Sequence, residues 1–398
     1  MRGYQELKQT EMGSIPKEWP TKKLGDTIAL EYGKGLPERA RLEGKYHVVG
    51  SIGIVGFHNQ ALVKGPGVVI GRKGTIGAVS LIESDFWPID TTYYIRKLNR
   101  VIHLKWLFFA LVKLNLPKLS LSDVVPGLKR ELVYALKLPL PSIFEQQKIA
   151  EILSTVDEAI EKTDQAIDKT RRLKKGLMQE LLTKGIGHKE FKDTEIGRIP
   201  KEWEVVRLSK VFKLASGKAR PPEFSDIANE NMPYPIYGGN GILGFTNKFM
   251  IDKETIVIGR VGEYCGSIHR TSKFAWISDN ALYAIEMQSH YSKLAFLTYY
   301  LTFMNLNRLK KKSGQPLMTQ AIVYSILLAL PPLLEQQKIA EILGTVDKRL
   351  EILRRRKERL ERVKKGLMDD LLTGKRRVKI LSKGGSHAVR NKKDRCIG

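Results

Sequence analysis

The chain has 398 residues, of which 42% are hydrophobic and 28% charged, and it carries a formal net charge of +26 at pH 7. This composition excludes a disordered chain, and the length is more than one ordinary core requires, so we expect two domains and connecting helices. A positive excess of this size implies a polyanionic partner, nucleic acid before membrane, because no amphipathic anchor or lipidation signal accompanies it.

The first module is predicted from motifs that return in the second half of the chain. Short β-branched runs bounded by glycines mark these motifs as strands and tight turns. Three pairs recur: TEMGSIPKEWPTKKLGD (10–26) and TEIGRIPKEWEVVRLSK (194–210), YHVVGSIGIVGFHN (46–59) and YPIYGGNGILGFTN (234–247), VVIGRKG (68–74) and IVIGRVG (256–262). In each half a helix follows, from residue 103 or 293, and then a polar loop and a strand-like run that ends in proline.

A long stretch ends both halves. Residues 145–183 return as residues 335–373 at a constant offset of 190 without a gap, and 22 of the 39 positions are identical. Apolar residues recur there at spacings of three and four, which is typical of a coiled-coil seam on a long helix. They are Ile149, Ile152, Val156, Ile160, Thr163 (in the place of an apolar residue) and Ile167, and then Ile339, Ile342, Val346, Leu350 and Leu353.

These elements predict an α+β protein with two repeated α/β modules, separated by two long antiparallel coiled-coil helices with approximate two-fold symmetry. The repeat offset drifts from 184 to 190 across the modules, so we expect the six extra residues of the second module to lie in loops. The expected segments are a first module at 1–144, a spacer helix at 145–184, a second module at 185–334, a second spacer helix at 335–374, and a basic, disordered tail at 375–398.

The cysteines and the apolar segments indicate in which cellular compartment the protein is expected. Cys265 and Cys396 form neither a disulfide framework nor a metal-type spacing, which fits a reducing cytoplasm. The start of the chain lacks the apolar stretch of a signal peptide. The most apolar run, 104–116, is short and contains Lys105 and Lys113, so it does not predict a transmembrane span. We therefore expect a cytoplasmic protein.

The element EQQKIAEIL after a proline-rich strand, IPKEW at the start of each module, and the order module, helix, module, helix resemble the specificity subunit of type I restriction-modification systems. The resemblance covers nearly the whole chain, up to the basic tail. It implies that each module is a target recognition domain that reads one half of a bipartite site in double-stranded DNA. It also implies that the helices form the spacer and dock methyltransferase (M) subunits, two of them, through which restriction (R) subunits join. The family subunit has no catalytic site, so S-adenosylmethionine, ATP and magnesium are expected on the partner subunits and no cofactor on this chain.

A search for catalytic motifs supports the same interpretation. The seven histidines are scattered, with no pair at ligand spacing, and the glycine-rich runs lack the Lys and Ser/Thr that a phosphate loop requires. NMPY at 231–234 is similar to the Asn-Pro-Pro-Tyr loop of adenine methyltransferases, but Met232 replaces the first proline and no cofactor-binding pattern precedes it. Two alternatives stay open: a fused methyltransferase or nuclease with unrecognised motifs, and a coiled-coil scaffold without a DNA role, against which the basic charge argues.

Loops near turns are where we expect DNA to be read. Arginine pairs with guanine, Asn and Gln pair with adenine, and phosphate contacts position the protein. Any single charge has an equally good interpretation as a solvated surface group, but the two sets occupy matching places. The predicted DNA-binding residues are Lys34, Arg39, Arg41, Arg72, Lys73, Thr91, Thr92, Tyr93, Lys129 and Arg130 in the first module, and Lys218, Arg220, Asn240, Arg260, Asn280, Lys310, Lys311, Lys312, Gln315 and Thr319 in the second.

The framework motifs repeat while the predicted contact positions diverge, for example Lys73 against Val261. Two copies that read the same sequence have no need of this divergence, so we predict an asymmetric bipartite site. The polar start of each long helix is a second candidate surface, either a junction between module and helix or a site of partner docking. Its residues are Glu145, Gln146, Gln147, Glu335, Gln336 and Gln337.

Overall fold

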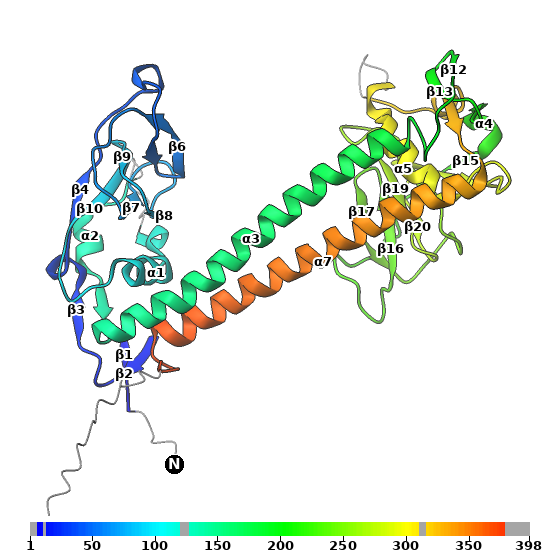
Figure 1. Cartoon of the computed structure of the whole chain (residues 1–398). Helices are drawn as coiled ribbons and strands as arrows, with labels where there is room; N and C mark the ends of the chain where they lie inside the picture. Colours follow the sequence, from blue (N-terminus) through cyan, green and yellow to red (C-terminus); the bar gives the residue numbers. More distant parts are fainter. Residues whose placement is uncertain (1–5, 11–12, 120–126, 310–315, 379–398) are drawn as a thin grey trace, which may run out of the picture. The chain divides into compact units, whose positions relative to one another are not determined.

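The computed structural model describes residues 6–10, 13–119, 127–309 and 316–378 (Figure 1). The chain divides into two compact units, Met1–Thr163 with Arg356–Gly398, and Asp164–Arg355. Two long helices, α3 (Ile143–Leu181) and α7 (Leu333–Leu372), contribute to both units.

The first unit is built on a four-stranded antiparallel sheet in the order β4-β10-β7-β8. Its central strand β7 has the sequence GVVIG and is buried along its whole length, as expected for a β-branched run covered on both faces. A second sheet has the order β6-β5-β9, in which β5 and β9 run parallel, and two strand pairs, β1-β2 and β11-β3, complete the unit. The strands are β1 (Leu7–Thr10), β2 (Gly13–Pro16), β3 (Thr21–Lys23), β4 (Ile28–Tyr32), β5 (Tyr46–Gly50), β6 (Gly53–His58), β7 (Gly67–Gly71), β8 (Val79–Ile82), β9 (Phe86–Pro88), β10 (Thr92–Leu98) and β11 (Lys137–Pro139).

Two helices pack on this sheet, α1 (Leu104–Leu114) and the short α2 (Arg130–Ala135). The imidazole of His103 caps α1 by accepting a hydrogen bond from the backbone N–H of Trp106, which requires a neutral ring nitrogen. Burial lowers the pKa of His103, with a smaller effect from Lys105, and so favours that neutral form. The helix ends at Asn115, whose left-handed φ of 54° is a common helix terminus.

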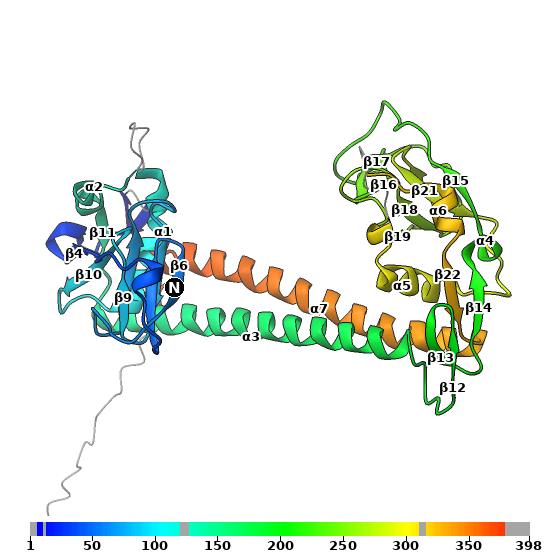
Figure 2. The same cartoon turned by 90° about the horizontal axis from the view of Figure 1, so that it is seen from above.

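The second unit repeats this architecture. Its main sheet has the order β15-β21-β18-β19, its second sheet the order β17-β16-β20, and the pairs β12-β13 and β14-β22 complete it. Figure 2 shows α5 between the main sheet and the long helices. The elements are β12 (Phe191–Thr194), β13 (Gly197–Pro200), β14 (Glu204–Arg207), α4 (Leu208–Val211), β15 (Lys213–Ser216), β16 (Tyr234–Gly238), β17 (Gly241–Thr246), β18 (Ile256–Gly259), β19 (Ile268–Arg270), β20 (Trp276–Ile277), β21 (Ala281–Ile285), α5 (Leu294–Met304), α6 (Gln320–Tyr324) and β22 (Leu327–Leu330).

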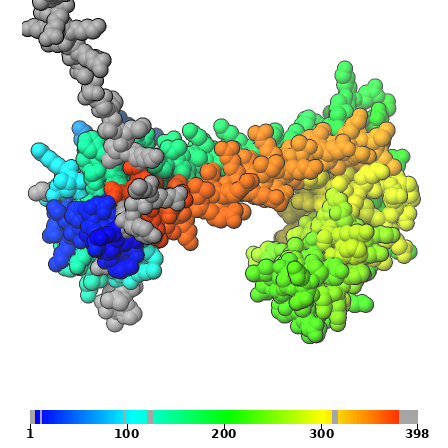
Figure 3. Space-filling model, turned by 90° about the horizontal axis from the view of Figure 1, so that it is seen from below, coloured from blue at the N-terminus to red at the C-terminus, as the bar shows by residue number. Residues whose placement is uncertain are grey.

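Within each unit a segment of α3 lies against a segment of α7, and the two run antiparallel (Figure 3). In the first unit, Lys364 Nζ lies 2.6 Å from Asp157 Oδ1. In the second unit, Lys174 Nζ lies 2.6 Å from Asp347 Oδ1. Each residue of one pair stands 190 positions from its equivalent in the other, so the same bridge is made twice with the roles of the two helices exchanged. The predicted α+β fold with repeated modules and two long paired helices is confirmed.

The modules are not separate from the helices, because each core includes residues of both. Leu153 at the start of α3 and Leu372 at the end of α7 are buried with Trp106 in the first core. Leu343 is buried in the same way in the second core, whereas Ile342, predicted to lie in the seam, is 38% exposed. Near the start of each long helix, the buried apolar residues therefore pack against the module.

The extra residues of the second module lie in loops, as predicted. Tyr32 and Ser216 both end the first strand of the main sheet at an offset of 184, and Tyr46 and Tyr234 both begin the next strand at an offset of 188. Four of the extra residues therefore fall between β15 and β16, where the loop bends back on itself through the isolated bridge between Asn229 and Met232.

Candidate nucleic-acid interface

Three loops meet at one end of the main sheet in the first unit. The N–H groups of Arg72 and Lys73 both donate to the carbonyl of Thr91, at 2.8 and 3.1 Å, and the N–H of Leu128 donates to the carbonyl of Arg72 at 3.0 Å. These bonds join the turn after β7, the residues before β10 and the segment before α2. Because Lys129 and Arg130 follow Leu128 directly, five of the predicted residues come together here.

An aromatic ring lies beside two guanidinium groups in this cluster. Tyr32 is 50% exposed, and the guanidinium carbons of Arg72 and Arg130 lie 5.1 and 4.6 Å from its ring centroid. Arg72 Nη2 donates to the carbonyl of Asp90 at 2.8 Å, and its Nε is buried without a hydrogen-bond partner among the described residues. The arrangement holds two cations in place beside an exposed ring, which suits contact with phosphates or base edges.

Tyr32 was not predicted from the sequence. A single aromatic residue at the end of a strand carries no spacing signal, and the matching position of the second module is Ser216. Its neighbours in space come from residues 40 and 98 positions away, so only the folded sheet brings them together.

The second unit makes the same loop junction with different side chains. The N–H of Arg260 donates to the carbonyl of Asn280 at 2.9 Å, and the N–H of Met318 donates to the carbonyl of Arg260 at 2.8 Å. Thr319 follows, and its hydroxyl caps α6 by accepting from the N–H of Ile322. Arg260, Asn280 and Thr319 thus occupy the places of Arg72, Thr91 and Lys129, and the bonds from Arg260 and Met318 repeat those from Arg72 and Leu128.

Asn240 also lies beside this junction. It is exposed in the turn between β16 and β17, and the preceding Gly239 packs so closely that a Cβ there would lie 3.4 Å from the backbone of Gly259 and 3.6 Å from the carbonyl of Asn280. The second module therefore presents two asparagine side chains near one arginine.

The remaining predicted residues are more dispersed. Lys34 and Lys218 are exposed, and their backbone N–H groups donate to the carbonyls of Pro88 and Ile277. These two acceptors end β9 and β20, just before the loops that carry Thr91 and Asn280. Arg39 is exposed in a short turn.

Two other arginines serve the loops that carry them. Arg41 is half-buried, and its Nη1 donates to the carbonyl of Val55 at 2.8 Å. The guanidinium carbon of Arg220 lies 3.7 Å from the ring centroid of Phe224. Lys310, Lys311, Lys312 and Gln315 lie outside the described residues.

Thr92 and Tyr93 belong to the interior of the first module. Both side chains are buried, the hydroxyl of Thr92 donates to the carbonyl of Ile89 at 2.7 Å, and that of Tyr93 donates to the carbonyl of Leu128 at 2.8 Å. Burial raises the pKa of Tyr93, so its hydroxyl stays a donor. Neither side chain faces solvent, because the start of β10 is covered on both faces, and we leave both out of the interface proposed below.

The polar starts of the long helices are junctions between helix and module. Gln146 is fully buried: its Oε1 accepts from the N–H of His103 at 2.8 Å, and its Nε2 donates to the carbonyls of Val101 and Pro141 at 2.9 and 3.0 Å. Gln336 is buried with the equivalent contacts in the second unit. Such buried amides are inaccessible to a partner, so the docking interpretation fails for Gln146 and Gln336 and the junction interpretation holds.

The glutamates before these glutamines are paired inside the protein too. Glu145 is buried and receives two hydrogen bonds from Arg377, at 2.6 and 3.0 Å, while Arg377 also pairs with Glu18. Glu335, half-buried, accepts from His188 at 2.9 Å and from Trp203 Nε1 at 3.1 Å. 

In both units a residue from the segment just after a long helix pairs with the glutamate: Arg377 follows α7, and His188 follows α3. Gln147 and Gln337, one residue further along their helices, are exposed, so of the six predicted docking residues these two face solvent.

Within residues 6–10, 13–119, 127–309 and 316–378, no three His, Cys, Asp or Glu side chains gather as metal ligands would. Over that part of the chain, no helix has both the length and the apolar character needed to cross a membrane.

Comparison with known proteins identifies the architecture. A family model described as the type I restriction modification DNA specificity domain matches residues 16–169 and 200–362. The specificity subunit of the type I restriction enzyme MjaVIII of Methanocaldococcus jannaschii is 27% identical over 452 residues, which cover 96% of this chain and 99% of that protein. The putative MjaX specificity subunit of the same organism is 37% identical over 259 residues, 61% of this chain and 60% of that protein.

A solved structure has the same fold. The crystal structure of the S subunit of a type I restriction-modification system from M. genitalium superposes with a TM-score of 0.67 and 19% identity, and the match covers 89% of this chain and 96% of that chain.

Proposed function

This chain belongs to the type I restriction modification DNA specificity family, and from that premise we propose how its modules and helices divide the work of recognition. The chain is a DNA sequence-recognition subunit of a type I restriction-modification system, in which each module reads one half of a bipartite site. The observation that most supports this assignment is the loop junction, because two equivalent backbone hydrogen bonds build it in both modules and the side chains around it differ.

The chemistry of the two junctions differs. The first offers guanidinium groups at Arg72 and Arg130 and exposed ammonium groups at Lys73 and Lys129, beside the exposed ring of Tyr32. Lysines of this kind neutralise phosphates and fix the register on the duplex, and an arginine can bind guanine in the major groove through two hydrogen bonds.

The second junction offers amides in addition to a cation. Asn240 and Asn280 are exposed, and Arg260 is bonded through its backbone to Asn280 in the same cluster. An asparagine amide donates to and accepts from adenine, whereas it matches guanine poorly. Two half-sites of different sequence, and therefore an asymmetric bipartite site, follow from this difference.

The helices act as spacer and as docking surface for two methyltransferase subunits, through which restriction subunits join. The exposed Gln147 and Gln337 at the helix starts belong to this docking surface, and the buried Gln146 and Gln336 hold the helices to the modules. S-adenosylmethionine, ATP and magnesium bind the partner subunits, and this chain performs no chemistry of its own. Purified chain incubated with DNA and either S-adenosylmethionine or magnesium should leave the DNA unmodified; methylated or cleaved product would establish an enzyme instead.

The length of the long helices supports their role as a spacer between the two modules. Helix α3 has 39 residues, which at about 1.5 Å per residue is about 58 Å. Half-sites that are one turn apart, about 34–36 Å, present the same face of DNA to both modules. Inserting four residues into each helix adds about 6 Å and should lengthen the preferred spacer by one or two base pairs; an unchanged spacer would refute the role.

The test of the interface is DNA affinity as a function of salt in the reconstituted complex. Arg72→Ala should weaken binding to the cognate site by about 1–3 kcal/mol and relax the sequence preference at one position. Lys17→Ala is the matched control: it removes one positive charge from the same unit, but Lys17 lies at the β1-β2 hairpin, paired with Glu6 at 2.9 Å. Equal effects of the two substitutions would mean that charge alone acts and that the loop junction is not the interface.

A further inference from the structure

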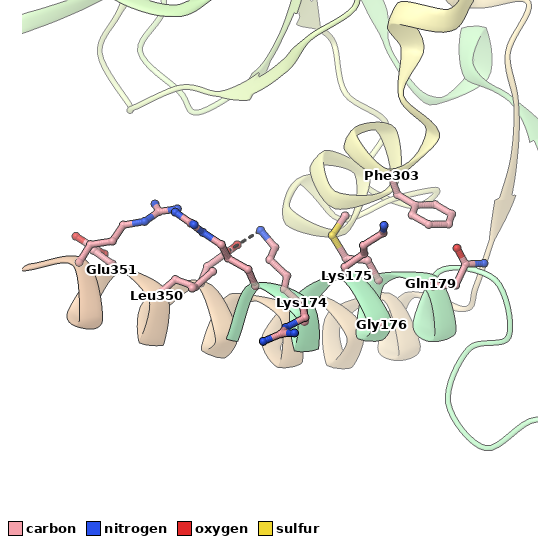
Figure 4. Close-up of a pocket in the computed structure, with 12 residues that line it drawn as sticks. Lys174, Lys175, Gly176, Gln179, Phe303, Leu350 and Glu351 are labelled. Carbon is pink, nitrogen blue, oxygen red and sulfur yellow. Dashed lines mark ion pairs between the residues drawn. The ribbon is translucent and has the colours of Figure 1, made fainter. Parts of the chain in front are cut away.

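The second unit has a groove where the helix pair meets α5 (Figure 4). Its volume is about 1060 Å³. Apolar side chains form the floor: Met178 comes from α3, Phe303 from α5 and Leu350 from α7. Figure 4 shows Phe303 extending from α5 toward α3, with Lys174 and Lys175 on the side of α3 that faces it. The groove is open to solvent beside Gly176, where an added Cβ would meet nothing within 4 Å.

The walls of the groove are basic. Five cationic side chains and two acidic ones line it. Lys174 is held by Asp347, which also accepts a hydrogen bond from the hydroxyl of Tyr299 at 2.8 Å. Arg172, Lys175 and Arg354 have no ion-pair partner among the residues that the structure describes. Among these described residues, three cations therefore stand without an ion-pair partner beside an apolar floor.

The equivalent place in the first unit is also hollowed, beside Glu361, Arg362 and Lys365, but the side chains around it carry a different charge. The twelve positions that stand 190 residues away from the lining carry four cations and five acids, so the net charge changes from +3 to −1. Lys113 stands in place of Phe303, and it donates a hydrogen bond to Asp369, which stands in place of Gln179. An internal ion pair therefore stands where the second unit has Phe303, while the other two floor positions stay apolar as Met368 and Ile160.

The contrast is confined to a few side chains. Arg172 and Lys175 have identical equivalents in Arg362 and Lys365, but Glu361 next to them replaces Arg171. The helices themselves are matched without a gap, so the difference does not come from a change in helix length or register.

We propose that this groove binds an acidic segment of one methyltransferase subunit, with carboxylates on the cationic walls and an apolar side chain on the floor. This inference rests on the proposed function and sharpens it, because it makes the docking positions of the two methyltransferase subunits unequal. A protein segment fits better than a DNA backbone: phosphates would satisfy Arg172, Lys175 and Arg354 but would leave Met178 and Phe303 without apolar contact. Free cations around an apolar centre also match the usual anatomy of a protein interface.

The internal repeat supplies a matched experiment. The groove variant combines Arg172→Glu with Lys175→Glu, and the control combines Arg362→Glu with Lys365→Glu, the same changes 190 residues away. Each is reconstituted with methyltransferase subunit, and the subunit ratio is followed by native mass spectrometry during dilution. The groove variant should release one of two methyltransferase subunits at a concentration about tenfold or more higher than wild type, while the control keeps both.

A second variant tests the groove without adding repulsive charge. Phe303→Lys combined with Gln179→Asp rebuilds in the second unit the pair that Lys113 and Asp369 form in the first. It should release the same methyltransferase subunit, and a helical circular dichroism signal equal to wild type shows that the fold is intact.

Three results would overturn the inference. The first is that the groove variant and its control release methyltransferase subunits at the same concentration. The second is that the groove variant and the Phe303→Lys, Gln179→Asp variant both keep two methyltransferase subunits as firmly as wild type. Alternatively, the variants would keep both subunits and lose DNA affinity with a reduced salt slope, in which case the occupant is DNA. A wild-type chain that binds no methyltransferase subunit would instead refute the proposed function.

Discussion

Replacing Gln146 with leucine tests whether the start of α3 is a structural junction. Leucine has nearly the same size, so the change leaves no large cavity. It removes three hydrogen bonds, from the N–H of His103 and to the carbonyls of Val101 and Pro141, at a fully buried position. Each backbone group left buried without a partner costs about 1–3 kcal/mol, so Gln146→Leu should cost at least about 3 kcal/mol.

The loss should be local, because all three partners lie at the start of α1 or at the end of the strand before α3. Hydrogen exchange followed by mass spectrometry on the peptide around residues 101–107 is the appropriate assay. A cost of about 3 kcal/mol corresponds to an opening equilibrium about a hundredfold more favourable. Gln147→Leu is the control, since Gln147 is exposed and its replacement should stay within about 0.5 kcal/mol. If Gln146→Leu left exchange unchanged but weakened methyltransferase binding, the residue would be a docking group and the junction account would be wrong.

Three further perturbations address the first unit. Arg377→Met leaves Glu145 buried without a cation, so the urea unfolding free energy should fall by about 3 kcal/mol, the low end for such a pair because Arg377 is itself partly exposed; an unchanged midpoint would contradict this role. Gly374→Ala should cost at least about 1 kcal/mol, because φ there is +70° and a Cβ would lie 2.6 Å from a proline ring; retained thermal stability would show that the turn adapts. The hydrogen bond from Lys113 lowers the pKa of Asp369, so the pair stabilises the fold above the ordinary Asp range and loses this effect as pH falls through the lowered pKa. The stabilities of wild type and Lys113→Met should therefore converge toward acid pH, and curves that stay parallel would exclude the pair.

The repeat made most of the architecture predictable. Recurrent motifs at fixed offsets identify two modules, and a gapless periodic stretch identifies two long helices, because both signals come from residues close together in the chain. The periodicity does not say what covers the buried stripe. Ile342 and Leu343 are neighbours, and only the position of α5 makes Leu343 the buried one. For that reason the sequence predicts a continuous seam where the structure divides the stripe between helix and module.

The site was predictable to the level of loops and not of side chains. Arg72 and Lys73 follow the end of β7 and Lys129 directly precedes α2, and the loops that carry them meet at one end of the main sheet. Thr92 and Tyr93 follow the same turn, but alternation in a strand covered on both faces gives no exposed side, and both are buried. A polar side chain also suggests solvent exposure wrongly where it is buried and all of its hydrogen bonds are made inside the protein.

Gln146 is the example of that error. An amide in a run of polar residues suggests exposure, and the acceptors that bury it are backbone groups, which the sequence does not distinguish. The pairing of Glu145 with Arg377 joins residues 232 positions apart and has no local signal at all.

Selection of binding sites from random DNA by the complex reconstituted around this chain tests the central claim most directly. The account predicts two conserved half-sites of different sequence, separated by a spacer of fixed length and unspecified sequence. Arg72→Ala should then relax one half-site, and Arg260→Ala the other. A single contiguous site, a perfect inverted repeat, or a failure to enrich any sequence would contradict the account.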